Sequence, residues 1–402
     1  MAHQVSARKY RPSTFADVVG QPFVVQTLRN AIRSGKIAHA YLFFGPRGVG
    51  KTTCARILAK AVNCENPTPE GDPCGTCNYC RRFAEGRALN VIELDAASHN
   101  SVDDIRLIVD QVQISPPEGR YKVYIIDEAH MLTTAAFNAF LKTLEEPPPH
   151  VIFILATTEK HKIPPTILSR CQRFDFRRIP TEEITKRLAY IAQQEGIEAE
   201  EAALFLIAAK SEGGLRDALS LFDQLVSRTS GKLSYEGVLE ALETLDYDAY
   251  FTLSEALVQW RAEDALKTLR SYIEAGYEPT TLLLGLLDHF RYLLLAKYQP
   301  SALGEGIPPH HRLRYKEEAP RYSEAFLLHA IDLLLEGERR LSYTRSPNIA
   351  LETTILKIAL LYQALRVEAP MPSPSISQAA RPSTLSERPS IPRTLEEAKK
   401  KS

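Results

Sequence analysis

The stretch from Gly45 to Thr52 limits the fold of this chain more than any other feature of its sequence. It reads Gly-Pro-Arg-Gly-Val-Gly-Lys-Thr and fits the pattern G-x-x-x-x-G-K-[ST], a loop that surrounds phosphate groups. An apolar run at 41–44 precedes the loop, and residues 51–63 have the apolar spacing of a helix. A strand, this loop and a helix in succession predict an α/β nucleotide-binding unit with a parallel sheet.

The residues of the loop have separate expected roles. Glycines permit the sharp turns that point several backbone N–H groups at one anion. Lys51 is expected to reach the β- and γ-phosphates, and Thr52 to offer its hydroxyl to Mg²⁺. A glycine turn that fits the pattern by chance is the alternative, which the order of strand, loop and helix disfavours. The predicted phosphate-binding residues are Gly45, Pro46, Arg47, Gly48, Val49, Gly50, Lys51, Thr52 and Thr53.

Two carboxylates end a second apolar run, at 122–126. Asp127 and Glu128 follow this run directly, at the carboxyl end of a strand, where α/β sheets bind ligands. Asp127 is expected to hold Mg²⁺ through water, and Glu128 to orient or deprotonate the attacking water. The alternative is that one of the two carboxylates caps a helix predicted at 132–145. The phosphate loop upstream favours the catalytic interpretation.

Three polar residues further along are candidates for phosphate contacts. Thr158 follows the apolar run 151–155, where a hydroxyl would face the γ-phosphate, although a threonine there can also simply cap the strand. Arg170 comes after a short helix-like stretch, and Arg216 opens a helix after two glycines. Arginine suits phosphate because its charge is permanent and its donors fork onto two oxygens. An arginine after a helix is otherwise an ordinary surface charge.

Four of the six cysteines have the spacing of a metal site. Cys64, Cys74, Cys77 and Cys80 form the pattern C-x9-C-x2-C-x2-C among glycines and a proline, which is typical of a turn-rich knuckle. Cysteines separated by two residues place two thiolates on one turn, as tetrahedral Zn²⁺ requires. Four ligands leave no open position, so the zinc would be structural. An iron–sulfur cluster and disulfides are the alternatives, and a reducing cytosol disfavours disulfides.

The rest of the chain predicts a change from α/β to all-α structure. Further apolar runs at 91–94, 151–155 and 173–176 alternate with helical patterns and extend the parallel sheet. From residue 181 onward the apolar spacing is helical, with a break near 245, until about residue 367. Residues 371–392 are rich in Pro, Ser and Arg without periodicity, which is typical of a disordered linker. The chain is long enough for two or three domains.

The motifs occur in an order that resembles one family. Residues 8–12 and 15–21 look like a motif that holds a nucleotide base. The phosphate loop, the cysteine knuckle, the sequence Asp-Glu-Ala-His at 127–130, Ser169-Arg170-Cys171 and Gly214-Leu215-Arg216 then follow. Over roughly residues 1–365 the chain resembles the tau/gamma family of bacterial DNA polymerase III clamp-loader subunits, which are AAA+ ATPases. The motifs are specific in combination, although the phosphate loop alone is not.

The resemblance implies a role for each motif residue. Thr158 would be the first sensor, with Thr157 as the alternative. Arg216 would be the second sensor, reading the nucleotide in its own subunit. Arg170 would act in trans, completing the ATP site of a neighbouring subunit. The residues expected to line the adenine pocket are Tyr10, Arg11, Pro12, Val18 and Val19.

The resemblance also implies a fold in several domains. The expected fold is an α/β AAA+ module with a parallel sheet, flanking helices and a zinc-knuckle insertion, followed by an all-α lid and an all-α collar. The expected boundaries are 1–179 with the knuckle at 64–80, 180–245 for the lid, 246–367 for the collar, and 368–402 for a disordered tail. The apolar helix faces after residue 246 are also compatible with an ordinary internal core, and the collar interpretation depends on the resemblance.

The chain ends just after three lysines, at 399–401. Members of the family often make a long and a short product by slippage on lysine codons. We therefore expect a short form or a truncation. An ordinary stop codon with no longer reading frame would contradict this expectation.

Charge and hydropathy restrict the expected partners. Lys and Arg total 49, as do Asp and Glu, so net charge does not indicate nucleic-acid binding. Any DNA contact must be local, near Ser169, Arg170 and the lid. The opening residues lack the apolar core of a signal peptide, and no apolar run approaches the ~20 residues of a membrane span. We expect a cytoplasmic, nucleoid-associated protein without a membrane partner.

The expected function is that of an ATPase motor subunit that opens a sliding clamp and loads it onto primed DNA for DNA polymerase III. It would use ATP, Mg²⁺ and a structural Zn²⁺. The implied partners are delta- and delta-prime-type subunits, further copies of the chain itself, the sliding clamp and primer–template DNA. A non-hydrolysing scaffold and another AAA+ DNA enzyme, such as a branch-migration helicase, are the alternatives. The intact nucleotide motifs disfavour the scaffold, and the cysteine insertion disfavours the helicase.

Overall fold

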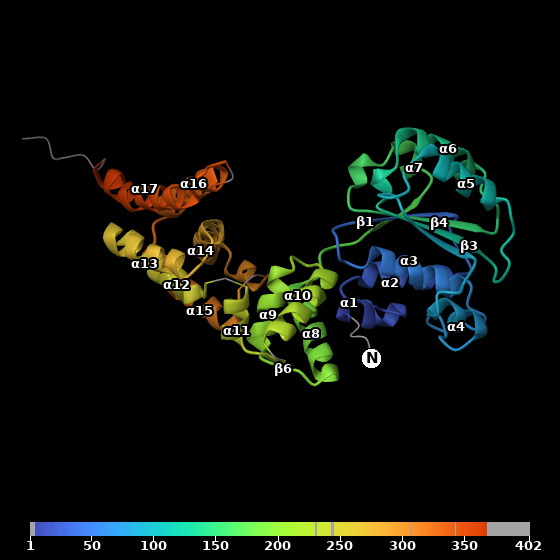
Figure 1. Ribbon diagram of the computed structural model, residues 1–402, viewed down its shortest axis with the longest axis horizontal. Helices are drawn as coiled ribbons and strands as arrows, with labels where there is room; N and C mark the ends of the chain where they lie inside the picture. The colour runs from blue at the N-terminus through green and yellow to red at the C-terminus, as the bar shows by residue number, and fades with distance from the viewer. Residues whose placement is uncertain (1–4, 230, 243–244, 306, 342, 368–402) are drawn as a thin grey trace, which may run out of the picture.

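The computed structural model describes residues 5–367, except 230, 243–244, 306 and 342. The chain forms an α/β part, a small helical part and a larger helical part, which follow one another in space as they do in sequence (Figure 1). The linker predicted at 371–392 and the closing lysines lie outside the described residues. Among the residues that are described, no helix has the length and apolar character needed to cross a membrane.

The α/β part is built on a five-stranded parallel sheet in the order β2-β3-β4-β1-β5. β1, which leads into the phosphate loop, lies between β4 and β5, and β4 separates it from β3. Parallel pairing brings the carboxyl ends of these strands to one edge, so the phosphate loop, Asp127 and Thr158 meet there. The strands are β1 (Ala40–Phe44), β2 (Val91–Asp95), β3 (Lys122–Asp127), β4 (Val151–Thr157) and β5 (Gln172–Asp175).

Successive residues of the central strands face two separate cores. Tyr41 and Phe43 pack on the side of α2 and α3, whereas Leu42 packs on the side of α5, α6 and α7. Because neighbouring side chains of a strand point to opposite faces, and both faces are covered, the strands read as continuous apolar runs. The covering helices are α2 (Pro22–Ser34), α3 (Lys51–Val62), α5 (Val102–Val112), α6 (Thr134–Glu145) and α7 (Pro165–Leu168).

Short elements complete this part. The cysteine knuckle lies between α3 and β2 and contains one helix of two turns. The carboxyl ends of β3 and β4 each lead into a single 3₁₀ turn. These elements are α4 (Asn78–Ala84) and the 3₁₀ helices η1 (Phe15–Asp17), η2 (Ala129–Met131) and η3 (Lys160–Lys162).

The small helical part has its own core and one feature that the sequence did not predict. Its helices bury apolar residues such as Leu188, Ile207 and Phe222 in a single cluster. Two short strands, β6 (Glu198–Ala199) and β7 (Lys232–Leu233), pair in parallel beside these helices. The helices are α8 (Thr181–Glu195), α9 (Glu201–Lys210), α10 (Leu215–Arg228) and α11 (Tyr235–Ala241).

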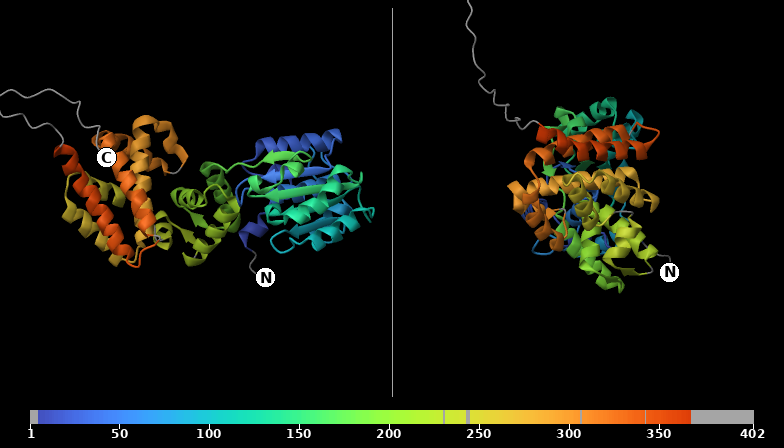
Figure 2. Two further views of the ribbon diagram at one scale, coloured as in Figure 1. Left: turned by 90° about the horizontal axis from the view of Figure 1, so that it is seen from above. Right: turned by 90° about the vertical axis from the view of Figure 1, so that its left-hand side faces the viewer.

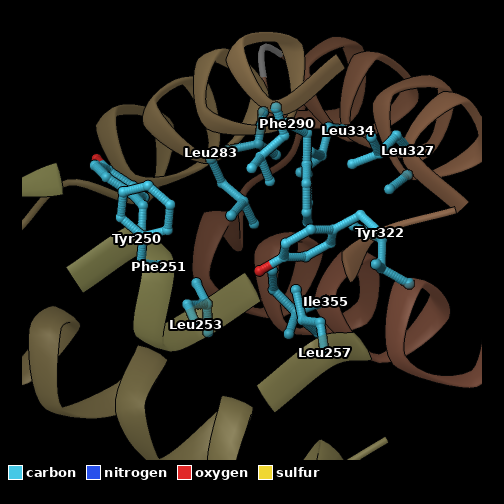
Figure 3. Close-up of a cluster of buried hydrophobic side chains, with 14 of the residues drawn as sticks. Tyr250, Phe251, Leu253, Leu257, Leu283, Phe290, Tyr322, Leu327, Leu334 and Ile355 are labelled. Carbon is cyan, nitrogen blue, oxygen red and sulfur yellow. The ribbon is translucent and has the colours of Figure 1, made fainter. Parts of the chain in front are cut away.

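The larger helical part encloses an apolar core. Side chains from α12, α14, α16 and α17 converge on it, among them Leu257, Phe290, Leu334 and Ile355 (Figure 3). Most of the apolar side chains predicted on these helices are therefore used within the chain. The elements are α12 (Tyr247–Val258), α13 (Ala262–Glu274), α14 (Pro279–Tyr298), η4 (Pro300–Glu305), α15 (Pro309–Glu318), η5 (Ala319–Arg321), α16 (Glu324–Leu341) and α17 (Pro347–Val367).

The first helix of the chain packs against the small helical part, which comes much later in the sequence. Helix α1 (Ser6–Lys9) lies against α10 of the small helical part, and the Ser6 N–H donates to Asp223 Oδ2 at 2.7 Å. The view from above shows the small helical part between the other two parts, with the N-terminal helix beside it (Figure 2, left). The predicted fold class, a parallel α/β module followed by helical parts, is confirmed.

Candidate functional site

Two glycines give the phosphate loop a shape that other residues would not allow. Gly45 has φ +149°, and an added Cβ would come within 2.1 Å of the Phe176 carbonyl oxygen. Gly48 has φ +76°, and an added Cβ would lie 3.2 Å from Gly214 Cα. Positive φ and such close approach both favour glycine. The loop is therefore held between the end of β5 and the start of α10.

Lys51 is buried and its side chain lies within the loop. Only 6% of the residue is exposed, and its Nζ donates to the carbonyl oxygens of Gly45 at 2.8 Å and Pro46 at 2.6 Å. Burial lowers the pKa of Lys51, and the nearby Glu128 and Asp127 carboxylates oppose that shift. The loop thus holds an ammonium group next to the backbone that would cradle phosphate.

Thr52 and Asp127 meet as the sequence predicted. Thr52 Oγ1 donates to Asp127 Oδ2 at 2.7 Å, which joins the start of α3 to the end of β3. Two neighbouring ligands of an octahedral Mg²⁺ lie about 2.9 Å apart, given metal–oxygen distances near 2.05 Å. A hydroxyl and a carboxylate that lie this close fit one Mg²⁺ site, in which Thr52 would bind the ion and Asp127 would hold it through water.

Glu128 has an unusual backbone conformation and a defined set of neighbours. Its φ of +47° is in the left-handed region, which costs a residue with a side chain about 1 kcal/mol or more. Its Oε2 accepts a hydrogen bond from Thr158 Oγ1 at 3.3 Å and lies 3.5 Å from His130 Nδ1. The carboxylate is thereby held between the ends of β3 and β4, beside the phosphate loop.

The two threonines after β4 differ in surroundings. Thr157 is fully buried, and its Oγ1 lies 3.1 Å from His130 Nδ1 and accepts from the Glu159 N–H at 3.0 Å. Thr158 is half-buried and faces Glu128. The geometry therefore puts Thr158, and not Thr157, beside the candidate catalytic carboxylate.

The alternative that Asp127 or Glu128 caps the helix predicted at 132–145 is wrong. Helix α6 begins at Thr134, and the Thr133 side chain caps it by accepting from the Ala136 N–H at 3.2 Å. The Asp127 carboxylate instead accepts from Thr52 and from the Glu128 N–H. The two carboxylates remain at the phosphate loop.

A cavity of about 530 Å³ opens beside the loop, between the α/β part and the small helical part. This volume is within the range of small-ligand sites in proteins. All five residues predicted for the adenine pocket line it, with Arg47 to Thr53, Asp127, Glu128 and Arg216. Gly45, Pro46, Thr158 and Arg170 do not line it. The other walls are Val5, Ala7, Arg8, Ile179, Leu215, Leu219 and Ser220, of which only Arg8 and Leu215 belong to motifs quoted from the sequence.

The small helical part contributes directly to this cavity. The Arg216 N–H donates to the Gly48 carbonyl at 3.3 Å, so the start of α10 touches the phosphate loop. On the other side, the hydroxyl of Tyr10 donates to Glu195, which also accepts from Lys9 Nζ at 2.6 Å. The base-side wall is therefore anchored to α8, and the phosphate side touches α10.

Arg170 lies elsewhere. Its Nη2 donates to Glu145 Oε1 at 2.6 Å, at the end of α6. It makes no contribution to the cavity wall of its own subunit. The structure therefore separates Arg170 from the residues of the phosphate loop that precede it in the chain.

The four predicted cysteines come together. Their sulfur atoms lie 3.7 to 4.0 Å apart for the pairs Cys64–Cys80, Cys74–Cys80 and Cys64–Cys77. The edge of a ZnS₄ tetrahedron is about 3.8 Å for Zn–S bonds of about 2.3 Å. Burial opposes ionisation of Cys74, but N–H groups of Cys77 and Thr76 donate to its sulfur and lower its pKa to about 6. Burial raises the pKa of Cys64 and Cys80, so it is the sulfur–sulfur distances that fit a tetrahedral zinc site.

Two side chains near the site were not predicted as site residues, although one of them, His130, belongs to the Asp-Glu-Ala-His sequence at 127–130. His130 lies between Glu128 and Glu159, with its Nε2 3.3 Å from Glu159 Oε1. It follows the carboxylates by two residues, so its proximity was a usable signal. Glu195 lies at the end of a helix far along the chain, and nothing in the sequence connects it to Tyr10.

Consecutive segments of the chain match family descriptions from one replication system. Residues 20–180 match "DNA polymerase III, delta subunit", and residues 183–231 match "DNA polymerase III clamp loader subunit, ATPase lid domain". Residues 233–371 match "DNA polymerase III subunits gamma and tau domain III".

Curated relatives have matching names. DNA polymerase III subunit tau of Bacillus subtilis is 44% identical over 89% of this chain and 63% of its own length. Subunit tau of Escherichia coli is 42% identical over 94% of this chain and 58% of its own length. Subunit gamma of Buchnera aphidicola is 36% identical over 89% of this chain and 99% of its own length. The chain belongs to the gamma/tau family of DNA polymerase III clamp-loader subunits. This confirms the resemblance.

The gamma/tau relatives differ in length. The chain spans about 60% of the tau subunits of B. subtilis and E. coli. Among solved structures, a Thermotoga maritima RuvB variant aligns with 65% of this chain and 85% of its own, at 20% identity and a TM-score of 0.44. That likeness is distant, and the family assignment depends on the sequence relatives.

Proposed function

We propose that this chain is an ATPase motor subunit of a sliding-clamp loader, coupling ATP binding and hydrolysis to clamp opening and loading onto primed DNA for DNA polymerase III. The observation that carries the proposal is the cavity in which a phosphate loop, the Thr52–Asp127 pair and Glu128 lie together in a gamma/tau family member. A scaffold that only bound nucleotide would not need Glu128 held beside the phosphate loop.

The residues of the cavity have separate roles in this proposal. Lys51 and the loop N–H groups bind the phosphates, and Tyr10 to Pro12 with Val18 and Val19 enclose the base. Thr52 and Asp127 hold Mg²⁺, which supplies charge neutralisation for phosphoryl transfer when bound. Glu128 orients the attacking water and takes its proton, and Thr158 holds the Glu128 carboxylate. Arg216 reads the nucleotide from α10.

Arg170 acts on a neighbouring subunit. Its absence from the walls of its own cavity and its place on a half-buried turn after α7 support a role in trans. A permanent cation delivered by a neighbour would stabilise charge on the transferred phosphate. Hydrolysis would then depend on assembly, as is required of a loader that hydrolyses ATP only on DNA.

The division into domains follows the expected boundaries. We propose a nucleotide-binding domain at 1–179, a lid at 180–245, a collar at 246–367 and a tail at 368–402. Separate apolar cores in the three described parts support the division of the first 367 residues. Cys64, Cys74, Cys77 and Cys80 hold a structural Zn²⁺ in the first domain.

The proposed partners follow from the family. They are delta- and delta-prime-type subunits, further copies of this chain, the sliding clamp and primer–template DNA. We propose a cytoplasmic, nucleoid-associated location for this chain, because its family takes part in DNA replication. The scaffold and the helicase remain as competing functions, and they differ from the loader in what stimulates ATP hydrolysis.

The test is steady-state ATPase of the chain assembled with its candidate partner subunits. We expect little turnover with no addition or with primed DNA alone, and strong stimulation with sliding clamp and primed DNA together. A full response to DNA alone would favour a helicase, and no turnover at all would favour a scaffold.

A further inference from the structure

The Arg170 guanidinium is held by three contacts within its own subunit. Its Nη2 donates to Glu145 Oε1 at 2.6 Å, and its Nη1 donates to the Thr166 carbonyl at 2.6 Å and to Ser169 Oγ at 3.2 Å. Thr166 precedes Arg170 by four residues. The side chain therefore folds back along α7 and does not extend away from the subunit.

The Glu145 contact joins two elements that are distant in sequence. Glu145 is the last residue of α6, and α6 packs against α7 just before Arg170. Two contacts of Arg170 come from its own helix, and only the Glu145 carboxylate brings a negative charge. A carboxylate and a phosphate oxygen use the same N–H donors of a guanidinium.

We infer that Glu145 is a positioning residue that holds Arg170 on its own subunit and competes with the nucleotide phosphate of a neighbouring subunit. The inference depends on the proposed trans role of Arg170. While the Glu145–Arg170 ion pair is intact, the neighbour's ATP site lacks its cation. When assembly brings a phosphate within reach, the phosphate displaces Glu145, and hydrolysis proceeds.

The strength of the ion pair suits a reversible contact. The Arg170 side chain is 32% exposed and that of Glu145 is 52% exposed. Exposed ion pairs of this kind shift an equilibrium by only about two- to five-fold. A nucleotide phosphate carries more charge than a carboxylate, so it can displace Glu145 once it is positioned.

The test uses Glu145→Gln in the assembled complex with partner subunits. Gln keeps the size of the side chain and removes the charge. We expect ATPase without DNA or clamp to rise about two- to five-fold, with an unchanged KM for ATP, and the isolated chain to be unaffected. The matched control is Glu146→Gln, because Glu146 is the next residue, is exposed and does not contact Arg170. This control should behave as the wild type.

A double variant shows whether Glu145 acts through Arg170. We expect Glu145→Gln combined with Arg170→Ala to have the ATPase of Arg170→Ala alone. An unchanged or lower rate for Glu145→Gln would overturn the inference, and so would a rise that persists in the double variant. The proposed trans role fails separately, if Arg170→Ala leaves the ATPase stimulated by clamp and DNA intact.

Discussion

Lys51 and His289 are both buried ionisable residues. The surroundings of Lys51 favour its charged form, whereas those of His289 favour its neutral form. Lys51 has two carbonyl partners and two nearby carboxylates, which offset the loss of water around its ammonium group. His289 lies in the core of the larger helical part, with Nδ1 2.8 Å from the Tyr315 hydroxyl and Nε2 2.9 Å from Ser254 Oγ. Burial, with a smaller effect of Arg314, lowers the pKa of His289 to about 3. His289 is therefore neutral at physiological pH.

Replacing Lys51 tests the phosphate loop at the scale of one residue. We expect Lys51→Ala to reduce ATP binding or turnover by at least about 10²-fold, because it removes a charge placed within the loop. The fold should persist, since Lys51 donates only to carbonyls of its own loop. Titration with a fluorescent ATP analogue and thermal unfolding measure the two effects. Lys36→Ala, on an exposed residue, is the control, and undiminished turnover of Lys51→Ala would refute the assignment.

The buried His289 predicts how stability depends on pH. The folded pKa is below the unfolded value, so between pH 6.5 and about 3 the unfolded chain binds the extra proton. The free energy of unfolding should therefore fall as pH decreases below 6.5, by up to about 1.4 kcal/mol per pH unit. Urea unfolding at pH 7 and pH 5 measures this, and Trp260, the one tryptophan of the chain, reports on the larger helical part.

A variant pair separates His289 from the other titrating groups. His289→Gln should have a flatter pH dependence than the wild type, whatever its effect at pH 7. His329→Gln, on an exposed residue of the same helical part, should keep the wild-type dependence. Equal slopes for wild type and His289→Gln would contradict the prediction.

At the scale of elements, the cysteine knuckle has almost no apolar core of its own. The buried members of its apolar cluster are Cys77, Tyr79 and Cys80, packed against Phe83, Ala88 and the two other cysteines. So small a cluster cannot offset the cost of ordering the turns between α3 and β2. The sulfur atoms at tetrahedral spacing support our proposal that a bound metal would supply the missing stabilisation.

Metal analysis and the replacement of one cysteine ligand test this element. We expect one zinc per chain by metal analysis, and Cys77→Ser should lose it and expose residues 64–90 to hydrogen exchange. The apolar core between the sheet and helices α2 and α3 should stay protected, because none of its buried residues belongs to the knuckle. Cys54→Ser, at a buried cysteine outside the cluster, is the control and should retain zinc. Iron with visible absorbance, or a metal-free protein with disulfides, would contradict the prediction.

At the scale of the whole molecule, the nucleotide site is shared between two parts. The phosphate loop belongs to the α/β part, yet the start of α10 lies against it through Gly48, Gly214 and Arg216. The N-terminal segment adds a second link, from Tyr10 to Glu195. Any change in the position of the small helical part must therefore change the walls of the cavity.

A substitution at the contact between the parts tests this link. An added Cβ at Gly214 would lie 3.2 Å from the Arg47 carbonyl oxygen and 2.8 Å from Asp217 Oδ2. We expect Gly214→Val to push α10 away from the phosphate loop and to weaken ATP binding by roughly ten-fold, as overpacking costs about 1–3 kcal/mol. Far-UV circular dichroism should be unchanged. Wild-type ATP affinity in a folded Gly214→Val protein would show that α10 does not control the site.

The sequence by itself determined the local units of this protein. The phosphate loop, the five strands, the pair Asp127–Glu128 and the cysteine spacing were each predicted from contiguous residues, and the fold class followed. These features are readable because glycine freedom, apolar periodicity and metal-ligand spacing act within a few residues of chain. The roles of Thr158, Arg170 and Arg216 came from the resemblance and stay predictions.

Only the tertiary structure decided which distant residues meet. Nothing in the sequence connects Glu145 to Arg170, Glu195 to Tyr10, or β6 to β7, and Thr133 took the capping role considered for the carboxylates. Each of these contacts depends on how whole elements pack, and packing is set by the summed burial of many side chains. A local sequence pattern does not give this summed burial. The partners of the site residues could therefore be found only in the folded chain.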